Sequence, residues 1–369
     1  DEILLTLAFA GLAAVAISPW VALAVVVVLV TVIASYRQNV HAYPSGAGDY
    51  EVATENLGRK AGLAVASALL VDYVLTVAVS ISAASQYAAA AIPALRGLEV
   101  PGAVAVVVLL AIANLRGLRA TGPALTIPAY LFMAAIGTLA VAGFIQHLAG
   151  TLGQADSAAL TIVPRSGFEE GLTGLAGAFL VMRAFSHGCA ALTGVEAVSS
   201  GVPSFARPRS RNAATTLLLL GAILATMMMS VVALARLTGV KIVESPARDL
   251  LRDGQPVGAE YHQDPVIGQL AATVFRDAPA LTLLIAAVTA LVLVVAANTA
   301  FTGFPGFGSV LARDGFLPRQ LHTRGDRLVY SNGIVSLSVA AIALIIAFDA
   351  EVTRLIHLYI VGVFISFTL

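Results

Sequence analysis

The chain has 369 residues, of which 59% are hydrophobic and only 11% are charged, and its formal net charge is zero. Soluble domains carry about a quarter charged residues, so this composition excludes an ordinary soluble domain and predicts an all-α polytopic membrane protein. A neutral chain offers no basic surface for nucleic acid, and the single cysteine, Cys189, excludes a disulfide framework and a cysteine-based metal site.

The sequence also lacks the short motifs of common enzymes. It contains no H-E-x-x-H zinc motif, no G-x-S-x-G nucleophile elbow and no nucleophile placed beside a histidine. Nothing resembles the repeated carbonyl filter of a potassium channel. We therefore expect neither an enzyme nor a channel, and no bound cofactor.

Apolar runs divide the chain into membrane spans. Because a span needs about 20 apolar residues, the 15 residues from Ile3 to Ile17 and the apolar end from Leu358 to Leu369 read as helices cut by the chain ends. We expect residues 1–369 to be one transmembrane domain that lacks the first half of its first helix and everything after the tenth. The remaining spans are expected at 19–35, 61–94, 100–113, 126–148, 172–205, 213–237, 278–300, 334–348 and 355–369.

The loops between these spans predict an orientation. Loops on the side of residues 36–60 carry 12 Lys and Arg residues, against 8 on the opposite side. Cytoplasmic loops are enriched in these residues, so the side of residues 36–60 and the N-terminus are expected in the cytoplasm. The long polar stretch from Thr238 to Asp264 is expected outside, and Val266 to Phe275 is expected to form a short interfacial helix.

The sixth span contains a predicted break. The run from Ser186 to Phe205 holds Gly188, Gly194, Gly201 and Pro203 within an apolar segment. Irregular backbone at membrane depth survives only where it lines protein or a water-filled cavity, and Gly-interrupted spans indicate a transporter's substrate site. Thr193 and Glu196 flank the break, so we expect them at a solute site. A kinked helix with Glu196 facing a watery vestibule is the alternative.

The third span carries one charge, Asp72. A carboxylate deep in a span is costly and usually marks an ion or proton path. Asp72, Thr76 and Ser80 recur every four residues and share one helix face, with Tyr73 nearby. The alternative is a structural Asp72 bonded to a neighbouring helix, with Thr76 and Ser80 as small packing residues.

Asp72, Thr76, Thr193 and Glu196 together offer only oxygen ligands, which suit hard cations or protons. An anionic substrate would require helix N-termini or Arg183 as positive groups, although Arg183 is expected in an outer vestibule. Tyr359 could close the site. His187 is expected to be a polar packing residue. The polar group at the end of the eighth span, which could hold an ion or cap a helix, comprises Asn298, Thr299 and Thr302.

Several runs resemble the amino acid–polyamine–organocation superfamily, and most of all its KimA-like bacterial potassium importers. The resemblance covers nearly the whole chain and is carried by SYRQNVHAYPSGAGDYEVATENLG, VDYVLTVAVSISAA, GCAALTGVEAVSSGVPSF, AANTAF, LARDGFLPRQL, YSNGIVSLSV and HLYIVGVFISFTL. It implies a LeuT-type transporter core of five plus five inverted-repeat helices, with discontinuous first and sixth helices. An inverted repeat also follows from helix order, because the broken span is the sixth.

The resemblance further implies proton-coupled potassium uptake across the bacterial inner membrane. The implied potassium or proton ligands are Asp72, Tyr73, Thr76, Thr193 and Glu196, with Ser80 and Tyr359 nearby. The expected partners are membrane lipid and a small cation or other small substrate, with a possible homodimer through a domain absent from this chain. A proton-coupled amino-acid permease of the same superfamily is the alternative function, and a non-transporting sensor is the third.

Overall fold

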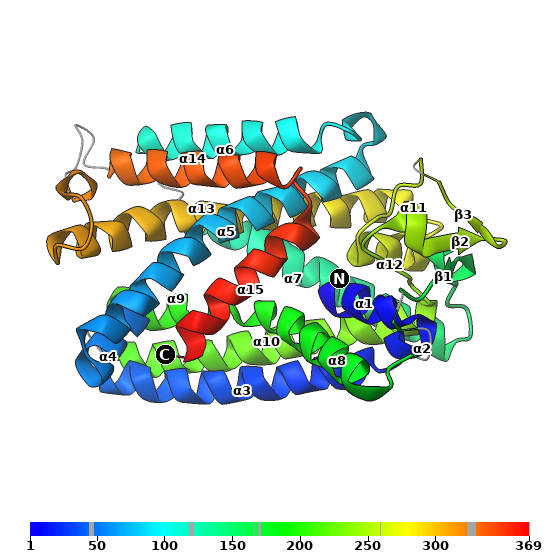
Figure 1. The fold of residues 1–369 in the computed structure, drawn as a ribbon, viewed down its shortest axis with the longest axis horizontal. Coiled ribbons are helices and arrows are strands. Elements are labelled where there is room, and N and C mark those ends of the chain that lie inside the picture. Colours follow the sequence, from blue (N-terminus) through cyan, green and yellow to red (C-terminus); the bar gives the residue numbers. More distant parts are fainter. Residues whose placement is uncertain are drawn as a thin grey trace. The chain divides into compact units, whose positions relative to one another are not determined.

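The computed structural model describes residues 1–43, 48–117, 122–165, 167–168, 171–258, 260–322 and 330–368. These residues are mostly helical, as the composition predicts, and Figure 1 shows their order along the chain. The chain divides into two compact units, residues 1–63 with 137–277 and residues 64–136 with 278–369. Three of the arginines that were counted to predict the orientation lie outside the described residues: Arg119, Arg324 and Arg327.

Within the described residues, six helices are long and apolar enough to cross a membrane. Their outward side chains include Trp20, Leu148, Leu175 and Phe179, which are each more than half exposed. Large apolar side chains exposed along whole helices suit a lipid surface better than water. The spans expected from residue 19 onward are confirmed as helical, and most of their ends differ from the predicted ends by only a few residues. Residues 3–17 instead form three short helical segments, interrupted at Gly11, where φ is 81°.

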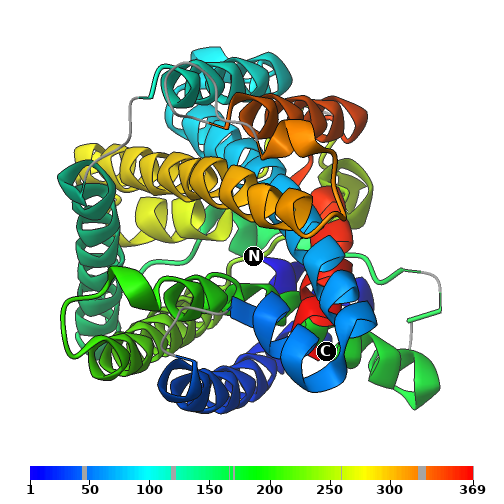
Figure 2. The same ribbon diagram turned by 90° about the vertical axis from the view of Figure 1, so that its left-hand side faces the viewer.

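The first unit combines short N-terminal helices, three long helices and a small sheet. Helices α3 and α10 pack side by side along their length (Figure 2). The elements of this unit are α1 (Glu2–Leu7), η1 (Ala8–Ala10), α2 (Leu12–Val15), α3 (Ser18–Ala42), α4 (Gly48–Leu57), the second half of α7 (Gly122–Leu148), η3 (Asp156–Ala159), β1 (Thr161–Ile162), α8 (Gly174–Gly188), η4 (Cys189–Leu192), α9 (Val195–Ser200), η5 (Val202–Ser204), α10 (Arg209–Thr238), α11 (Pro246–Asp249), β2 (Leu250–Arg252), β3 (Gln255–Pro256) and α12 (Val266–Val274).

The small sheet corrects the all-α prediction. Strands β1, β2 and β3 pair antiparallel, with Leu250 opposite Ile162. The β2–β3 hairpin turns at Asp253 and Gly254, which both adopt positive φ. An Asp-Gly pair is a strong two-residue hairpin signal, so this turn could have been predicted within the long polar stretch from Thr238 to Asp264.

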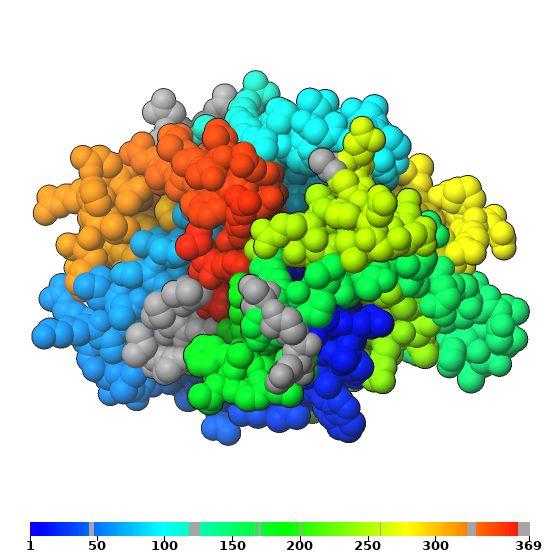
Figure 3. Space-filling model, turned by 45° about the vertical axis from the view of Figure 1, so that its right-hand side comes forward, coloured from blue at the N-terminus to red at the C-terminus, as the bar shows by residue number. Residues whose placement is uncertain are grey.

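A small apolar core anchors this sheet. Ile162 and Leu250 are buried together with Ala8, Leu160 and Val243. The N-terminal segment (blue) lies at the surface next to green residues in the space-filling view of Figure 3. The Arg165 N–H donates to the Phe9 carbonyl at 2.9 Å. The sheet and the N-terminal helices are thus held in one unit.

The second unit is built around long apolar helices. Helix α6 lies beside α14 (Figure 1), and α14 also packs on α13. The elements are most of α5 (Arg59–Ala91), η2 (Pro93–Leu95), α6 (Glu99–Leu115), the first half of α7, α13 (Pro279–Arg313), η6 (Arg319–Leu321), α14 (Ser331–Ala347) and α15 (Val352–Thr368).

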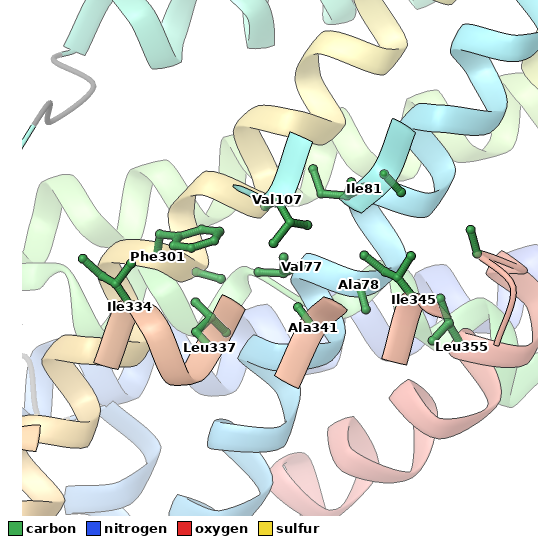
Figure 4. Close-up of a cluster of buried hydrophobic side chains, with 14 residues drawn as sticks. Val77, Ala78, Ile81, Val107, Phe301, Ile334, Leu337, Ala341, Ile345 and Leu355 are labelled. Atoms are coloured by element: carbon green, nitrogen blue, oxygen red, sulfur yellow. The ribbon is translucent and has the colours of Figure 1, made fainter. Parts of the chain in front are cut away.

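The core of this second unit interleaves small and large side chains from α5, α6, α13, α14 and α15 (Figure 4). Ala78, Ala103 and Ala341 are fully buried or nearly so. Membrane helices associate mainly by close van der Waals packing, which small residues permit. The same reason explains Gly333, where an added Cβ would lie only 2.8 Å from the Pro305 Cβ of α13.

Candidate functional site

Asp72 is buried in the middle of α5, with 8% of its surface exposed. The Tyr359 side chain, which is 7% exposed on α15, forms a hydrogen bond with the Asp72 side chain. Because an ionised carboxylate only accepts hydrogen bonds, the Tyr359 hydroxyl is the donor. Figure 1 shows α15 (red) running beside α5 (blue) in this unit. The structure thus brings together two predicted site residues, Asp72 and Tyr359, that lie far apart in the sequence.

The other predicted residues of α5 have mixed surroundings. Ser80 is buried and Thr76 is half-buried on the same helix face as Asp72. Tyr73 points to α13, where its ring meets Phe304 edge to face with 6.5 Å between ring centroids. An added Cβ on Gly303 would lie 2.5 Å from the Tyr73 ring. Tyr73 therefore packs against α13.

The predicted break is present after α8. Helix α8 ends at Gly188, η4 covers Cys189–Leu192, and Gly194 adopts a left-handed backbone with φ of 90° before α9 begins. Glycine reaches this conformation without the Cβ penalty that other residues pay. The sequence therefore identified both the interruption and the residue on which it depends.

Both predicted polar residues at this break bond to nearby backbone. The Gly194 N–H donates to the two carboxylate oxygens of Glu196, at 3.0 and 2.9 Å, and the Thr193 hydroxyl donates to the Ala190 carbonyl at 2.9 Å. A carboxylate in the first turn of a helix satisfies a backbone donor and favours the positive helix end. Glu196 and Thr193 thus stabilise the break locally while keeping oxygen lone pairs at it.

The first unit contains another partly buried acidic group, Asp49, which was not predicted. Asp49 lies in α4, which packs against α9, and the Tyr36 hydroxyl of α3 donates to both Asp49 oxygens at 2.9 and 2.8 Å. Burial raises the pKa of the Asp49 carboxyl, and the hydrogen bond from Tyr36 acts in the opposite direction. The sequence predicts a loop with an amphipathic turn over residues 36–60, so the helix α4 and its bond to Tyr36 were missed. Within DYEVATENL, Ala53 is the buried residue of α4.

The remaining polar candidates have structural partners. Asn114 of α6 donates to Asn298 of α13 at 2.9 Å, a hydrogen bond between two membrane helices. Helix α13 continues to Arg313, so the interpretation of Asn298, Thr299 and Thr302 as a helix-end cap is wrong. Arg183 is exposed and lies over the Phe9 ring, 5.2 Å from its centroid.

His187 is buried and forms a hydrogen bond with Thr6. Among the described residues, no three His, Cys, Asp or Glu side chains are grouped to hold a metal ion. The candidate chemistry therefore rests on carboxylate, hydroxyl and backbone oxygens, which bind alkali cations and protons better than transition metals.

These features define a polytopic membrane permease. Residues 3–369 match the model of a family described as amino acid permease, and the chain belongs to that family. The expectation of a transporter rather than an enzyme is thereby confirmed. The chain is also 41% identical over 369 residues to the potassium transporter KimA of Bacillus subtilis strain 168, an alignment that covers all of this chain and 56% of that protein. The chain thus spans little more than half the length of that relative.

Proposed function

We propose that this chain is the transport core of a potassium importer that couples potassium uptake to protons. The observation that carries the proposal is the 41% identity, along the whole of this chain, to a potassium transporter. The oxygen-rich side chains agree with it, because potassium is a hard cation that prefers oxygen ligands. Potassium and protons are then the cargo, and no further cofactor is needed.

The proposed ligands fall into two groups. One comprises Asp72 and Thr76 of α5, with Tyr73, Ser80 and Tyr359 nearby, and the other comprises Thr193 and Glu196 at the break before α9. Asp72 supports the proposal best, because it is a buried carboxylate on a membrane helix and such groups are retained mainly for ion and proton paths. Its hydrogen bond with Tyr359 joins α5 to α15 at this carboxyl group.

We further propose a LeuT-type core of five plus five inverted-repeat helices in the bacterial inner membrane, with the N-terminus in the cytoplasm. The family match, the break after α8 and the helix order support this arrangement. The proposed surroundings are membrane lipid and, in the full-length protein, a possible homodimer formed by a domain outside this chain. A cysteine placed at Gln255 should react with an external reagent, in a Cys189→Ala background, and one placed at Arg209 should not.

The family description favours one second candidate, a proton-coupled amino-acid permease. In that case Asp72 or Glu196 would bind the substrate's amine. The two functions are separated by expressing the full-length protein in a bacterium that lacks its own potassium uptake systems. Growth on limiting potassium supports the importer. Failure to grow, together with uptake of a radiolabelled amino acid, supports the permease.

A further inference from the structure

A buried polar cluster links α1 to the end of α8. His187 is 6% exposed and Thr6 is fully buried. The His187 Nδ1 lies 2.9 Å from the Thr6 hydroxyl oxygen and 3.7 Å from a Glu2 carboxylate oxygen. Glu2 itself is largely enclosed, with 12% of its side chain exposed. A titratable base, a titratable acid and a hydroxyl therefore share one enclosed place between α1 and the end of α8.

The backbone is arranged to bring these groups together. Glu2 and Thr6 are four residues apart in α1 and so lie on the same helix face. Next to His187, an added Cβ on Gly188 would lie 2.9 Å from Ile3 of α1 and 2.7 Å from Val25 of α3. A glycine at this position thus permits close approach of the three helices. The contact between Glu2, Thr6 and His187 follows from that approach.

The cluster can hold its histidine in two protonation states. When Nδ1 carries no proton, the Thr6 hydroxyl donates to that nitrogen. When Nδ1 carries a proton, it donates to the Thr6 oxygen, and the Glu2 carboxylate 3.7 Å away balances the charge. A hydroxyl serves both states because it is a donor and an acceptor. Interacting acid and base groups bind protons as a pair, and no backbone change is needed between the states.

Few other charges face this cluster. Arg183, one turn earlier on α8, lies over Phe9, which also contacts Arg165 at 3.9 Å. Arg165 in turn pairs with Glu244 and Asp249. The neighbouring half of α3, residues 18–35, has no titratable side chain. The buried Cys189 thiol and Asp1 are close to the cluster in sequence, and the Asp1 carboxylate accepts from the Val266 N–H.

We propose that Glu2, Thr6 and His187 form a proton-binding site that carries the coupled proton. The inference rests on the proposed proton-coupled function, and it assigns the proton to residues other than the proposed cation ligands. Buried ionisable groups in membrane helices are costly and mark proton relays in pumps and transporters. Histidine is also the side chain that changes charge between about pH 5 and 8, where a bacterial symporter must respond.

The test uses the full-length protein in proteoliposomes, with potassium influx and internal acidification recorded together over that pH range. His187→Gln keeps a neutral polar side chain but cannot carry a proton. We expect it to retain potassium influx, to lose the pH dependence of that influx, and to bring acidification down to the level of protein-free liposomes. Glu2→Gln should change the pH profile in the same direction, whereas Thr6→Ser should behave as the parent because it keeps the hydroxyl.

His147→Gln is the matched control, because His147 is exposed at the end of α7. A merely structural role for His187 would lower influx equally at every pH and leave the ratio of protons to potassium unchanged, and that result overturns the proposal. If His187→Gln is not recovered as folded protein, Glu2→Gln decides by the same two readouts. A parent that moves no potassium contradicts the proposed function instead, so the two failures are distinguishable.

Discussion

The two carboxylates proposed as cation ligands are held in different ways. Asp72 lies within the continuous helix α5, and its partner, Tyr359, comes from a distant helix. Glu196 lies at a helix break, and its partner is the N–H of Gly194, two residues away. A cap of this kind has a local structural purpose. The α5 helix would form without a carboxylate at position 72, so the cost of burying Asp72 is best explained by function.

The largest expected effect comes from removing the charge at position 72. Asp72→Asn keeps an oxygen ligand but removes the negative charge, and we expect it to abolish potassium uptake by the full-length protein. Asp277→Asn is the control, because Asp277 is exposed before α13, and it should take up potassium at the parental rate. Both proteins should be compared by growth of a potassium-uptake-deficient bacterium on limiting potassium. Parental growth of Asp72→Asn would remove Asp72 from the site.

Loss of the Tyr359 hydroxyl should have a smaller effect. Tyr359→Phe keeps the ring but leaves the Asp72 carboxylate without this donor. Hydrogen bonds to charged groups contribute about 1.5–3 kcal/mol, so the apparent potassium affinity should fall roughly ten- to a hundredfold. Uptake measured over a range of potassium concentrations should show a raised KM. An unchanged KM would mean that the Asp72–Tyr359 bond only supports packing.

At the other carboxylate, the expected change is in stability. Glu196→Ala removes the acceptor for the Gly194 N–H and should cost about 1 kcal/mol, the usual size of a helix-capping interaction. Glu196→Gln retains one oxygen acceptor and should lose less. Thermal unfolding of the two purified variants in the same detergent would show the order. Equal melting temperatures for both variants and the parent would contradict the capping role.

The smallest effect is expected at Asp49, as a pH dependence. Burial raises the pKa of this carboxyl in the folded protein, so the folded state favours its protonated form. Its contribution to stability is therefore present below the ordinary carboxyl pKa of about 3.9 and is lost as the pH rises through the raised folded value. Asp49→Asn should flatten this decline in a series of melting curves, while Glu55→Gln, exposed on the same helix α4, should follow the parent.

Much of the helical framework could be predicted from the sequence, because lipid demands long apolar runs. The run from Ala61 to Ala94 became α5 at Arg59–Ala91, and the glycine pattern located the break at Gly194. These features depend on local composition and on the backbone of one residue. A single sequence contains that information directly.

The features that were missed depend on contacts between distant segments or on short turns. The bond of Thr6 to His187 joins residues 181 positions apart, and no local pattern reveals it. Helix α4 is short and weakly amphipathic, and it gains its place by packing on α9 and by the Tyr36–Asp49 bond. The Gly- and Arg-rich stretch from Phe304 to Asp326 predicts a loop and so places Asn298 near a helix end, yet α13 continues through Pro305 to Arg313.

The central claim is that the cargo is a potassium ion whose charge is met by Asp72. The most direct measurement is potassium influx into proteoliposomes that contain the full-length parent or its Asp72→Asn variant, with radiolabelled amino-acid uptake recorded on the same vesicles. We expect potassium influx with the parent, none with Asp72→Asn, and no amino-acid accumulation with either. Equal potassium influx by the two proteins, or amino-acid accumulation without potassium influx, would contradict the claim.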